Sequence, residues 1–167
     1  PQILKRVLHT SAMMGVRHLF LIRSARVEKS YFSSPLLQPQ KMFSYLREGL
    51  EQGVSTILPQ VSLHQRFRGF LEEELPRATE QTSCALLAEP SAEQSLWALA
   101  RSRGFRNGEN ALLAVGPEGG WQDHEVAAFR DHGFAPFHCG PRVLRVDAAV
   151  CSLLGQIDLL RHLGGHC

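Results

Sequence analysis

Apolar positions along this chain alternate between the spacing of helices and the spacing of strands. Helical spacing predicts helices over residues 3–14, 39–52, 66–75, 91–103, 122–132 and 147–163. Short apolar runs predict strands over residues 18–22, 56–61, 84–88, 111–115 and 134–138. Strands that alternate with helices of this length are typical of an α/β domain with a mostly parallel sheet.

Prolines and capping residues refine the ends of these elements. Pro59 makes the second strand an edge strand or an irregular one, because proline has no N–H to donate. Pro76 is expected to end the third helix. Ser91 and Gln94 have the spacing of a capping box, which would start the fourth helix. Exposed loops are expected over residues 30–39 and 103–110.

The composition fits one compact domain and excludes few functions. The chain has 167 residues, 44% of them hydrophobic, a formal net charge of +2 and a pI near 8.6. This is not the strong positive field of a protein that holds nucleic acid by charge alone, although arginines cluster, as at Arg23 with Arg26 and Arg142 with Arg145. No run approaches the ~20 apolar residues of a membrane span, and no signal peptide is recognisable.

The cysteines indicate the compartment. Cys84, Cys139, Cys151 and Cys167 are far apart and form no Cys-x-x-Cys pair. This pattern is typical of a reducing compartment without a disulfide framework, so we expect a cytoplasmic protein. The chain starts at Pro1 without an initiator methionine, so we expect that the full protein has sequence upstream.

Residues 115–123 carry the densest signal in the chain. They follow the apolar strand 111–115 and precede a helix with Val126 and Phe129 on one face. Three glycines, one proline and one carboxylate lie in the turn between the two elements. Glycine lets a backbone approach a ligand closely, and a strand end that opens into a helix is where open α/β proteins bind ligands.

Three segments follow predicted strands in the C-terminal half of the chain: residues 87–90, 116–120 and 139–145. Because the carboxyl ends of parallel strands meet at one edge of a sheet, we expect the three segments to lie together. Two of them contain a Gly-Pro pair, and all three offer backbone N–H and C=O groups in tight turns. Such turns suit a flat, uncharged ring better than a polyphosphate.

Sequence signatures of several other functions are missing. No P-loop motif and no Gly-x-Gly-x-x-Gly after the first strand is present, which disfavours a Walker-type NTPase and a dinucleotide-binding protein. His124-Glu125 lacks the second histidine of a zinc protease, and no Gly-x-Ser-x-Gly elbow occurs. His162, His166 and Cys167 lie close together, but a frayed tail is a plainer interpretation than a metal site, so we expect no bound metal.

Two motifs carry a resemblance to a known family. Gly116-Pro117-Glu118-Gly119-Gly120 is followed about twenty residues later by Gly140-Pro141-Arg142-Val143-Leu144-Arg145, each after a strand and before a helix. In this order they resemble the motifs of the RsmE-type 16S rRNA (uracil-N3)-methyltransferases of the SPOUT superfamily. Weaker similarities spread over nearly the whole chain, at Gly15-Val16, Arg26, Glu48, Glu51-Gln52 and Pro59.

The resemblance implies an α/β fold whose mostly parallel sheet is flanked by helices and whose C-terminal part forms a deep trefoil knot. It implies S-adenosylmethionine as cofactor and transfer of its methyl group to N3 of a uridine in the 16S rRNA of the small ribosomal subunit. It also implies a homodimer in which the partner chain completes each site. Residues 1–167 would be the SPOUT methyltransferase domain, without the N-terminal PUA-like RNA-binding β-barrel that the family also carries.

The same resemblance assigns roles to residues. The cofactor would contact the three loops, at Leu87, Ala88, Glu89, Gly116, Pro117, Glu118, Gly119, Gly120, Cys139, Gly140, Arg142, Val143, Leu144 and Arg145. In catalysis, Arg145 would stabilise the developing uracil oxyanion, Arg142 would contact phosphate or substrate, and Glu118 would orient cofactor or substrate. Arg26, Arg66 and Arg145 would contact the RNA.

Plainer roles for these residues stay open. Arg142 and Arg145 could cap carbonyl groups or pair with Glu118 or Asp147, and Glu118 could simply cap the helix that begins near Gln122. Val146-Asp147-Ala148 also stands where the family usually has Thr-Glu-Thr. Two alternatives follow: a SPOUT methyltransferase acting on another RNA, such as a tRNA ribose 2′-hydroxyl, or a non-catalytic RNA-binding protein of ribosome assembly.

Overall fold

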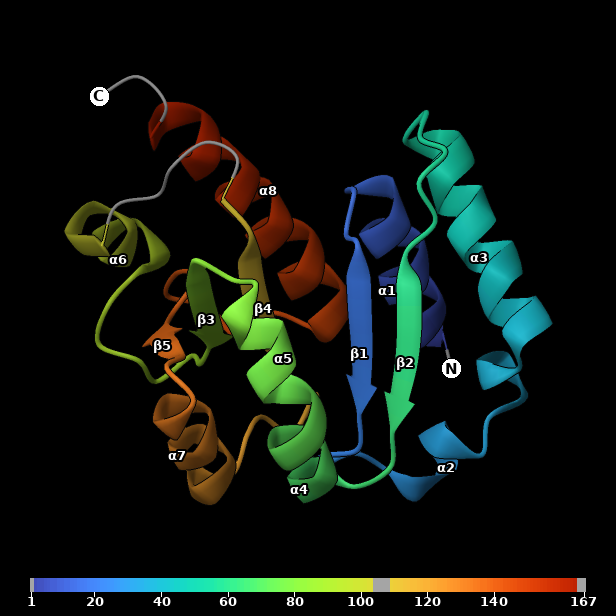
Figure 1. The fold of residues 1–167 in the computed structure, drawn as a ribbon, viewed down its shortest axis with the longest axis horizontal. Coiled ribbons are helices and arrows are strands. Elements are labelled where there is room, and N and C mark those ends of the chain that lie inside the picture. The colour runs from blue at the N-terminus through green and yellow to red at the C-terminus, as the bar shows by residue number, and fades with distance from the viewer. Residues whose placement is uncertain (1, 104–108, 165–167) are drawn as a thin grey trace.

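The computed structural model describes residues 2–103 and 109–164, and within them five strands form two sheets (Figure 1). Strand β1 (His18–Ile22) pairs with β2 (Gln60–His64), and the second sheet has the order β4 (Ala111–Val115), β3 (Cys84–Ala88), β5 (Ala135–Phe137). All three ladders are parallel. The predicted α/β class with parallel strands is confirmed, although the strands form two sheets instead of one.

Helices flank both sheets. In the described residues they are α1 (Gln2–Met13), α2 (Lys29–Phe32), η1 (Pro35–Leu37), α3 (Pro39–Gln52), α4 (Phe67–Gly69), η2 (Phe70–Glu74), α5 (Leu75–Glu80), α6 (Leu96–Arg103), α7 (Asp123–Asp131) and α8 (Val146–Gly164). The predicted stops are confirmed at Gly53, the C-cap of α3, and at Gly133, which follows α7 with a φ of +84°.

The three-stranded sheet is covered on both faces. On β3, Leu86 packs into one buried cluster with Leu153 and Ile157 of α8, whereas its neighbour Leu87 packs into a second cluster with Phe129 of α7. Successive strand residues point to opposite faces, so both faces must be apolar. This explains why β3 and β4 are continuous apolar runs in the sequence.

Helices α1 and α3 pack closely together beside the two-stranded sheet. Leu8 of α1 forms a buried cluster with Leu46 and Leu50 of α3. At the crossing point, a Cβ added to Gly49 would collide with the backbone carbonyl oxygen of His9. The glycine therefore allows the two helices to approach this closely.

Side-chain packing, rather than a backbone ladder, joins the two sheets. Phe20 and Ile22 of β1 pack against the cluster that contains Phe70, Trp121 and Phe129. Helices α1 and α8 also contact each other across the boundary, as Figure 1 shows. The two sheets are thus parts of one packed body.

Two predicted boundaries near prolines are wrong. The second strand starts at Gln60, after Pro59, because proline cannot donate to the ladder. Pro76 does not end a helix: α4, η2 and α5 follow one another without a break from Phe67 to Glu80. The η2 segment, just before Pro76, is a π turn, in which the backbone hydrogen bonds span one residue more than in an α-helix. In a regular α-helix the pyrrolidine ring of the proline would clash with the carbonyl group four residues earlier.

The capping residue predicted for α6 is also wrong. The helix begins at Leu96, and Ser95 Oγ accepts a hydrogen bond of 3.2 Å from the Ala98 N–H. Ser91 instead donates its N–H and its hydroxyl to Glu89 Oε1, at 3.2 and 2.9 Å. Ser91 therefore closes the turn after β3, and the helix starts one turn later.

Two further predictions concern loops and the tail. Residues 30–39 contain the short helices α2 and η1, so the predicted loop there is wrong in part. The middle of the predicted loop 103–110 lies outside the described residues, as do His166 and Cys167.

Candidate functional site

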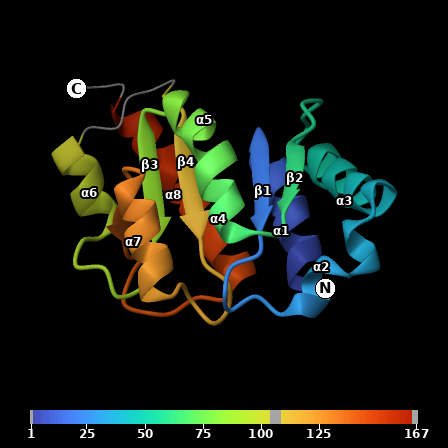
Figure 2. The ribbon, with the colours of Figure 1, turned by 60° about the horizontal axis from the view of Figure 1, so that its bottom comes forward.

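The three loops singled out in the sequence lie at one edge of the three-stranded sheet. Because β4, β3 and β5 are parallel neighbours, the segments that follow them leave from the same end, at the lower edge in Figure 2. The Glu89 N–H donates to the Phe137 carbonyl at 2.9 Å, and the His138 N–H donates to the Gln94 carbonyl at 2.9 Å. The loop after β3 is therefore held against the start of the loop after β5.

The turn after β4 is built by its glycines. The Gly120 N–H donates to the Pro117 carbonyl at 2.8 Å, and Gly120 has a φ of +71°. A Cβ on Gly116 would stand 3.1 Å from Nε1 of the buried Trp121. The turn is thus tight on its inner side, whereas Glu118 at its tip is exposed.

The helix cap next to this turn is Glu125 rather than Glu118. Glu125 is 1% exposed; its Oε2 accepts from the Gln122 N–H and its Oε1 from the Ala25 N–H, both at 2.8 Å. The carboxylate therefore caps α7 and also ties it to the loop that follows β1. Sequence reasoning missed this residue, although a glutamate three positions after the N-cap is the usual capping-box signal.

Arg26 fixes the same two segments together. Its Nη1 donates to the Gly119 carbonyl at 2.6 Å and to the Trp121 carbonyl at 3.3 Å. A Cβ on Gly119 would lie 3.1 Å from the Arg26 Cβ, so the side chain lies directly against the turn. The guanidinium is exposed and has five donors, so it can also contact a ligand.

The loop after β5 exposes apolar side chains. Val143 is 80% exposed and Leu144 is 38% exposed, whereas Cys139 is half-buried against the core. His138, which the sequence did not single out, organises the start of the loop: its Nδ1 accepts from the Gly140 N–H at 3.2 Å, and its carbonyl accepts from the Leu96 N–H at 3.3 Å. The loop is anchored at His138 and open at its tip.

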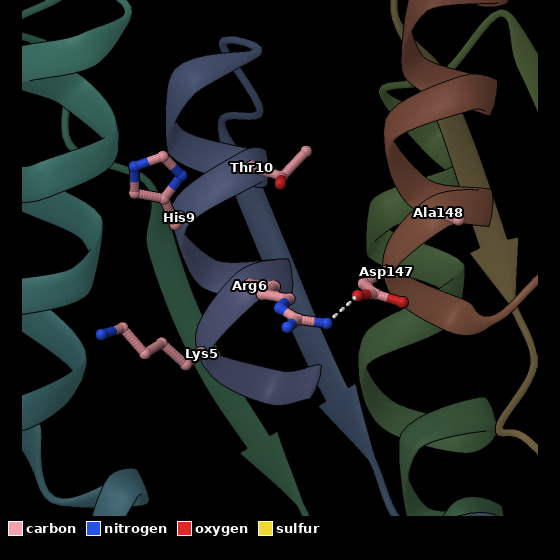
Figure 3. Close-up of a pocket in the computed structure, with 6 residues that line it drawn as sticks. All are labelled: Lys5, Arg6, His9, Thr10, Asp147 and Ala148. Atoms are coloured by element: carbon pink, nitrogen blue, oxygen red, sulfur yellow. Dashed lines mark hydrogen bonds and ion pairs between the residues drawn. The ribbon is translucent and has the colours of Figure 1, made fainter. Parts of the chain in front are cut away.

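Arg145 lies immediately before α8 and forms an ion pair. Its Nη2 is 3.3 Å from Asp147 Oδ2, and Arg6 Nη1 of α1 donates to the same oxygen at 2.9 Å. Figure 3 shows Arg6 reaching from α1 toward Asp147, beside a cavity of about 280 Å³. The hydrogen bond from Arg6, assisted by the charge of Arg145, lowers the pKa of Asp147 below its usual range despite partial desolvation.

The other predicted residues are placed as follows. Leu87 is fully buried and its side chain belongs to the core, so only its backbone can face a ligand. Arg142 is exposed, and Arg66 is exposed just before α4 on the side of β2. Neither forms an ion pair with another described residue.

Metal-ligand clusters, membrane-spanning helices and cysteines were the remaining features to compare with the sequence. The described residues contain no cluster of side chains that could hold a metal ion and no helix long and apolar enough to cross a membrane. The described cysteines Cys84, Cys139 and Cys151 are all free. Burial raises the pKa of the Cys84 thiol, which keeps that side chain in its neutral form.

The fold is an α/β domain of parallel strands, and its three loops meet at the carboxyl ends of those strands, which is where such domains usually bind ligands. The chain belongs to the RNA methyltransferase domain family, which matches residues 1–158. The resemblance that the paired motifs indicated is thereby confirmed.

Individual relatives agree with the family. The chain is 29% identical over 152 residues to the ribosomal RNA small subunit methyltransferase E of Treponema pallidum, and 25% identical over 150 residues to methyltransferase E 1 of Borreliella burgdorferi. These matches cover 91% and 89% of the chain but only 56% and 59% of the relatives. The chain therefore spans a little over half of their length.

Solved structures share the fold. A methyltransferase E from Neisseria gonorrhoeae bound to S-adenosylmethionine superimposes with a TM-score of 0.75 at 19% identity, over 96% of this chain and 62% of that one. A protein from Legionella pneumophila, also solved with bound S-adenosylmethionine, gives a TM-score of 0.72 at 23% identity, over 95% of this chain and 62% of that one. At this level of identity the structures establish the fold alone.

Proposed function

We propose that this chain transfers the methyl group of S-adenosylmethionine to N3 of a uridine in the 16S rRNA of the small ribosomal subunit. One observation carries the proposal: in a chain of the RNA methyltransferase domain family, three loops lie at a single sheet edge, and two of them contain the paired glycine motifs. The curated relatives are named as methyltransferases of the small-subunit rRNA, which supports the choice of substrate.

The residues at this edge fit the proposed cofactor. Val143 and Leu144 offer exposed apolar side chains to an adenine ring, and the loops after β3, β4 and β5 offer main-chain donors and acceptors to its edges. The glycines of the turn 116–120 leave no side chain between its backbone and a bound molecule. When bound, S-adenosylmethionine supplies an electrophilic methyl group on a sulfonium.

The protein must hold the uracil in line with that methyl group and help N3 lose its proton. We assign the stabilisation of the resulting oxyanion to Arg145. Its side chain is 62% exposed, and the contact with Asp147 uses one of its two terminal nitrogens, so other N–H donors stay available. Asp147, itself held by Arg6, would orient the guanidinium.

The same ion pair also favours a second candidate function. An arginine held by Asp147 at the start of α8 could serve the fold alone, which would suit a non-catalytic RNA-binding protein. The two candidates differ in cofactor binding and in the fate of the RNA.

Further features are proposed on the family resemblance. Residues 1–167 would act as the methyltransferase domain of a cytoplasmic protein. A C-terminal trefoil knot is proposed on this resemblance; the hydrogen bonds between the loop after β3 and the loop after β5 hold the two segments side by side, which threading of one past the other would require. A homodimer is supported by Leu159 and Leu163, which are four residues apart on α8 and are 58% and 50% exposed.

The proposal is tested by calorimetry with S-adenosylmethionine, followed by incubation with small ribosomal subunits and mass mapping of the modified base. We expect binding of the cofactor and a gain of one methyl group on a uracil base. Cofactor binding with methylation of a ribose would favour the alternative RNA substrate. No binding of the cofactor would favour the non-catalytic protein.

A further inference from the structure

A second cavity lies at the carboxyl ends of β1 and β2, apart from the three loops. Its volume is about 300 Å³, at the small end of the range for ligand sites. The residues around it come from the loop after β1, the segment after β2 and the start of α7, and they include Arg23, Ser24, Ala25, Phe67, His124 and Glu125.

A buried hydroxyl on the wall of this cavity lacks a partner. Ser24 is only 4% exposed, and its Oγ makes no hydrogen bond in the described structure. Buried polar side chains nearly always have a hydrogen-bond partner, so an exception calls for an explanation. A ligand that enters the cavity would supply the missing partner.

The other walls combine an aromatic ring with unpaired polar groups. Phe67 is held by ring contacts with Trp121 and Phe129, at centroid distances of 6.5 and 5.6 Å. Arg23 and His124 form no hydrogen bond or ion pair through their side chains with another described residue. A flat apolar surface, a hydroxyl for a ring edge and a cation for a phosphate are what an unstacked nucleotide requires.

The position of the cavity relates it to the proposed active site. The Ala25 N–H is bonded to Glu125, and Arg26 is bonded to the carbonyls of Gly119 and Trp121. The wall of the cavity is therefore tied directly to the turn after β4, although the cavity opens beside that turn.

We propose that this cavity binds one unstacked base of the RNA substrate, next in the strand to the base that is methylated. Ser24 bonds the edge of the base, Phe67 lies against its face, and Arg23 and His124 contact its phosphate. The inference rests on the proposed function for the position of this base next to the methylated one. Binding of the RNA in the cavity can be measured without methylation.

The test is a titration of the isotope-labelled protein with single-stranded hexauridylate, followed through backbone amide NMR signals. We expect the signals of residues 23–27 and 124–125 to shift. Ser24→Ala should weaken binding about fivefold, the loss of one hydrogen bond. It should leave the melting temperature unchanged or higher, because no hydrogen bond within the protein is removed. Arg23→Ala should weaken binding about tenfold.

Arg17→Ala is the matched control, because Arg17 is exposed and precedes β1 at its opposite end. It should change the affinity less than twofold.

Three results would overturn the inference. The signals of residues 23–27 and 124–125 could stay in place at saturating RNA. Ser24→Ala could bind the RNA as wild type does, in which case the hydroxyl takes no part in binding. Inorganic polyphosphate could shift the same signals to the same extent, in which case no base is recognised. Absence of cofactor binding in wild type would instead refute the proposed methyl transfer and leave the cavity result intact.

Discussion

The two sheets of this protein are built from the same unit, a parallel strand followed by a helix, yet they are buried differently. All five positions of β3 and of β4 are apolar, and helices cover both faces. Strand β2 contains Gln60, Ser62 and His64, and its Leu63 is 41% exposed. The three-stranded sheet has apolar clusters on both sides, with Leu86 and Leu87 fully buried. The two-stranded sheet has no fully buried residue, and its Leu19 and Val61 pack against the cluster that α1 and α3 form.

The loops of the two sheets differ as well. The turn after β4 and the loop after β5 offer main-chain groups and exposed apolar side chains. The loop after β1 offers the charged Arg23 and Arg26 and the buried Ser24. We propose a division of labour, in which the C-terminal sheet holds the cofactor and, through Arg145, the uracil, whereas the N-terminal sheet supplies further contacts to the RNA.

The largest expected effect concerns Arg145, at the C-terminal sheet. Arg145→Ala should lower turnover about 100-fold, because a fixed cation near the developing oxyanion is lost. Cofactor affinity, measured by calorimetry, should stay within twofold of wild type. Arg130→Ala, an exposed arginine on α7, is the control and should retain full turnover. Normal turnover in Arg145→Ala would remove Arg145 from the mechanism.

The packing of α1 against α3 can be broken at Gly49. Gly49→Ala should lower the free energy of unfolding by roughly 1–3 kcal/mol, because its Cβ would overlap the His9 carbonyl oxygen and stand 3.0 Å from the Ala12 Cβ. Gly155→Ala on α8 is the control, since nothing lies within 4 Å of its Cβ position.

The control should gain roughly 0.5–1 kcal/mol, because alanine is the better helix former. Urea denaturation measures both variants. Equal values for the two would show that the N-terminal helices do not depend on close approach.

A smaller effect is expected at Val54, in the turn after α3. Val54 is 93% exposed and has a φ of +50°, a conformation that strains a β-branched residue. Val54→Gly should raise the free energy of unfolding by about 0.5–1 kcal/mol, the relief of that strain less the entropy of glycine. Ile57→Gly, in the same connection but without a positive φ, should show no gain.

The smallest effect concerns Asp147, which links the two halves through Arg6. The pKa of Asp147 is lowered in the folded protein, so its contribution to stability is present above the unfolded value of about 3.9 and is lost as pH falls through the lowered pKa. The melting temperature of Asp147→Asn should therefore lie slightly below that of wild type at pH 7. The gap should close in acid, and a gap that persists there would rule out the ion pair as its cause.

The sequence by itself determined the class of the protein and much of its local structure. The strands over 84–88 and 111–115 were predicted to the residue, because a strand buried on both faces must be apolar throughout. The paired glycine motifs indicated the family and the edge at which the loops meet. Each of these signals is local, since it depends on the spacing of residues within one strand, turn or helix.

Only the tertiary structure decided the contacts between distant elements. Asp147 meets Arg6, which is 141 residues away in the chain, and Glu125 meets Ala25, which is 100 residues away. Pro76 follows a π turn instead of ending a helix, and Ser24 lines a cavity, because the packing around them fixes the backbone. The periodicity of apolar residues indicates which side of a helix or strand is buried, but not which element packs against that side. The cavities depend on which elements pack together, so the sequence alone did not predict them.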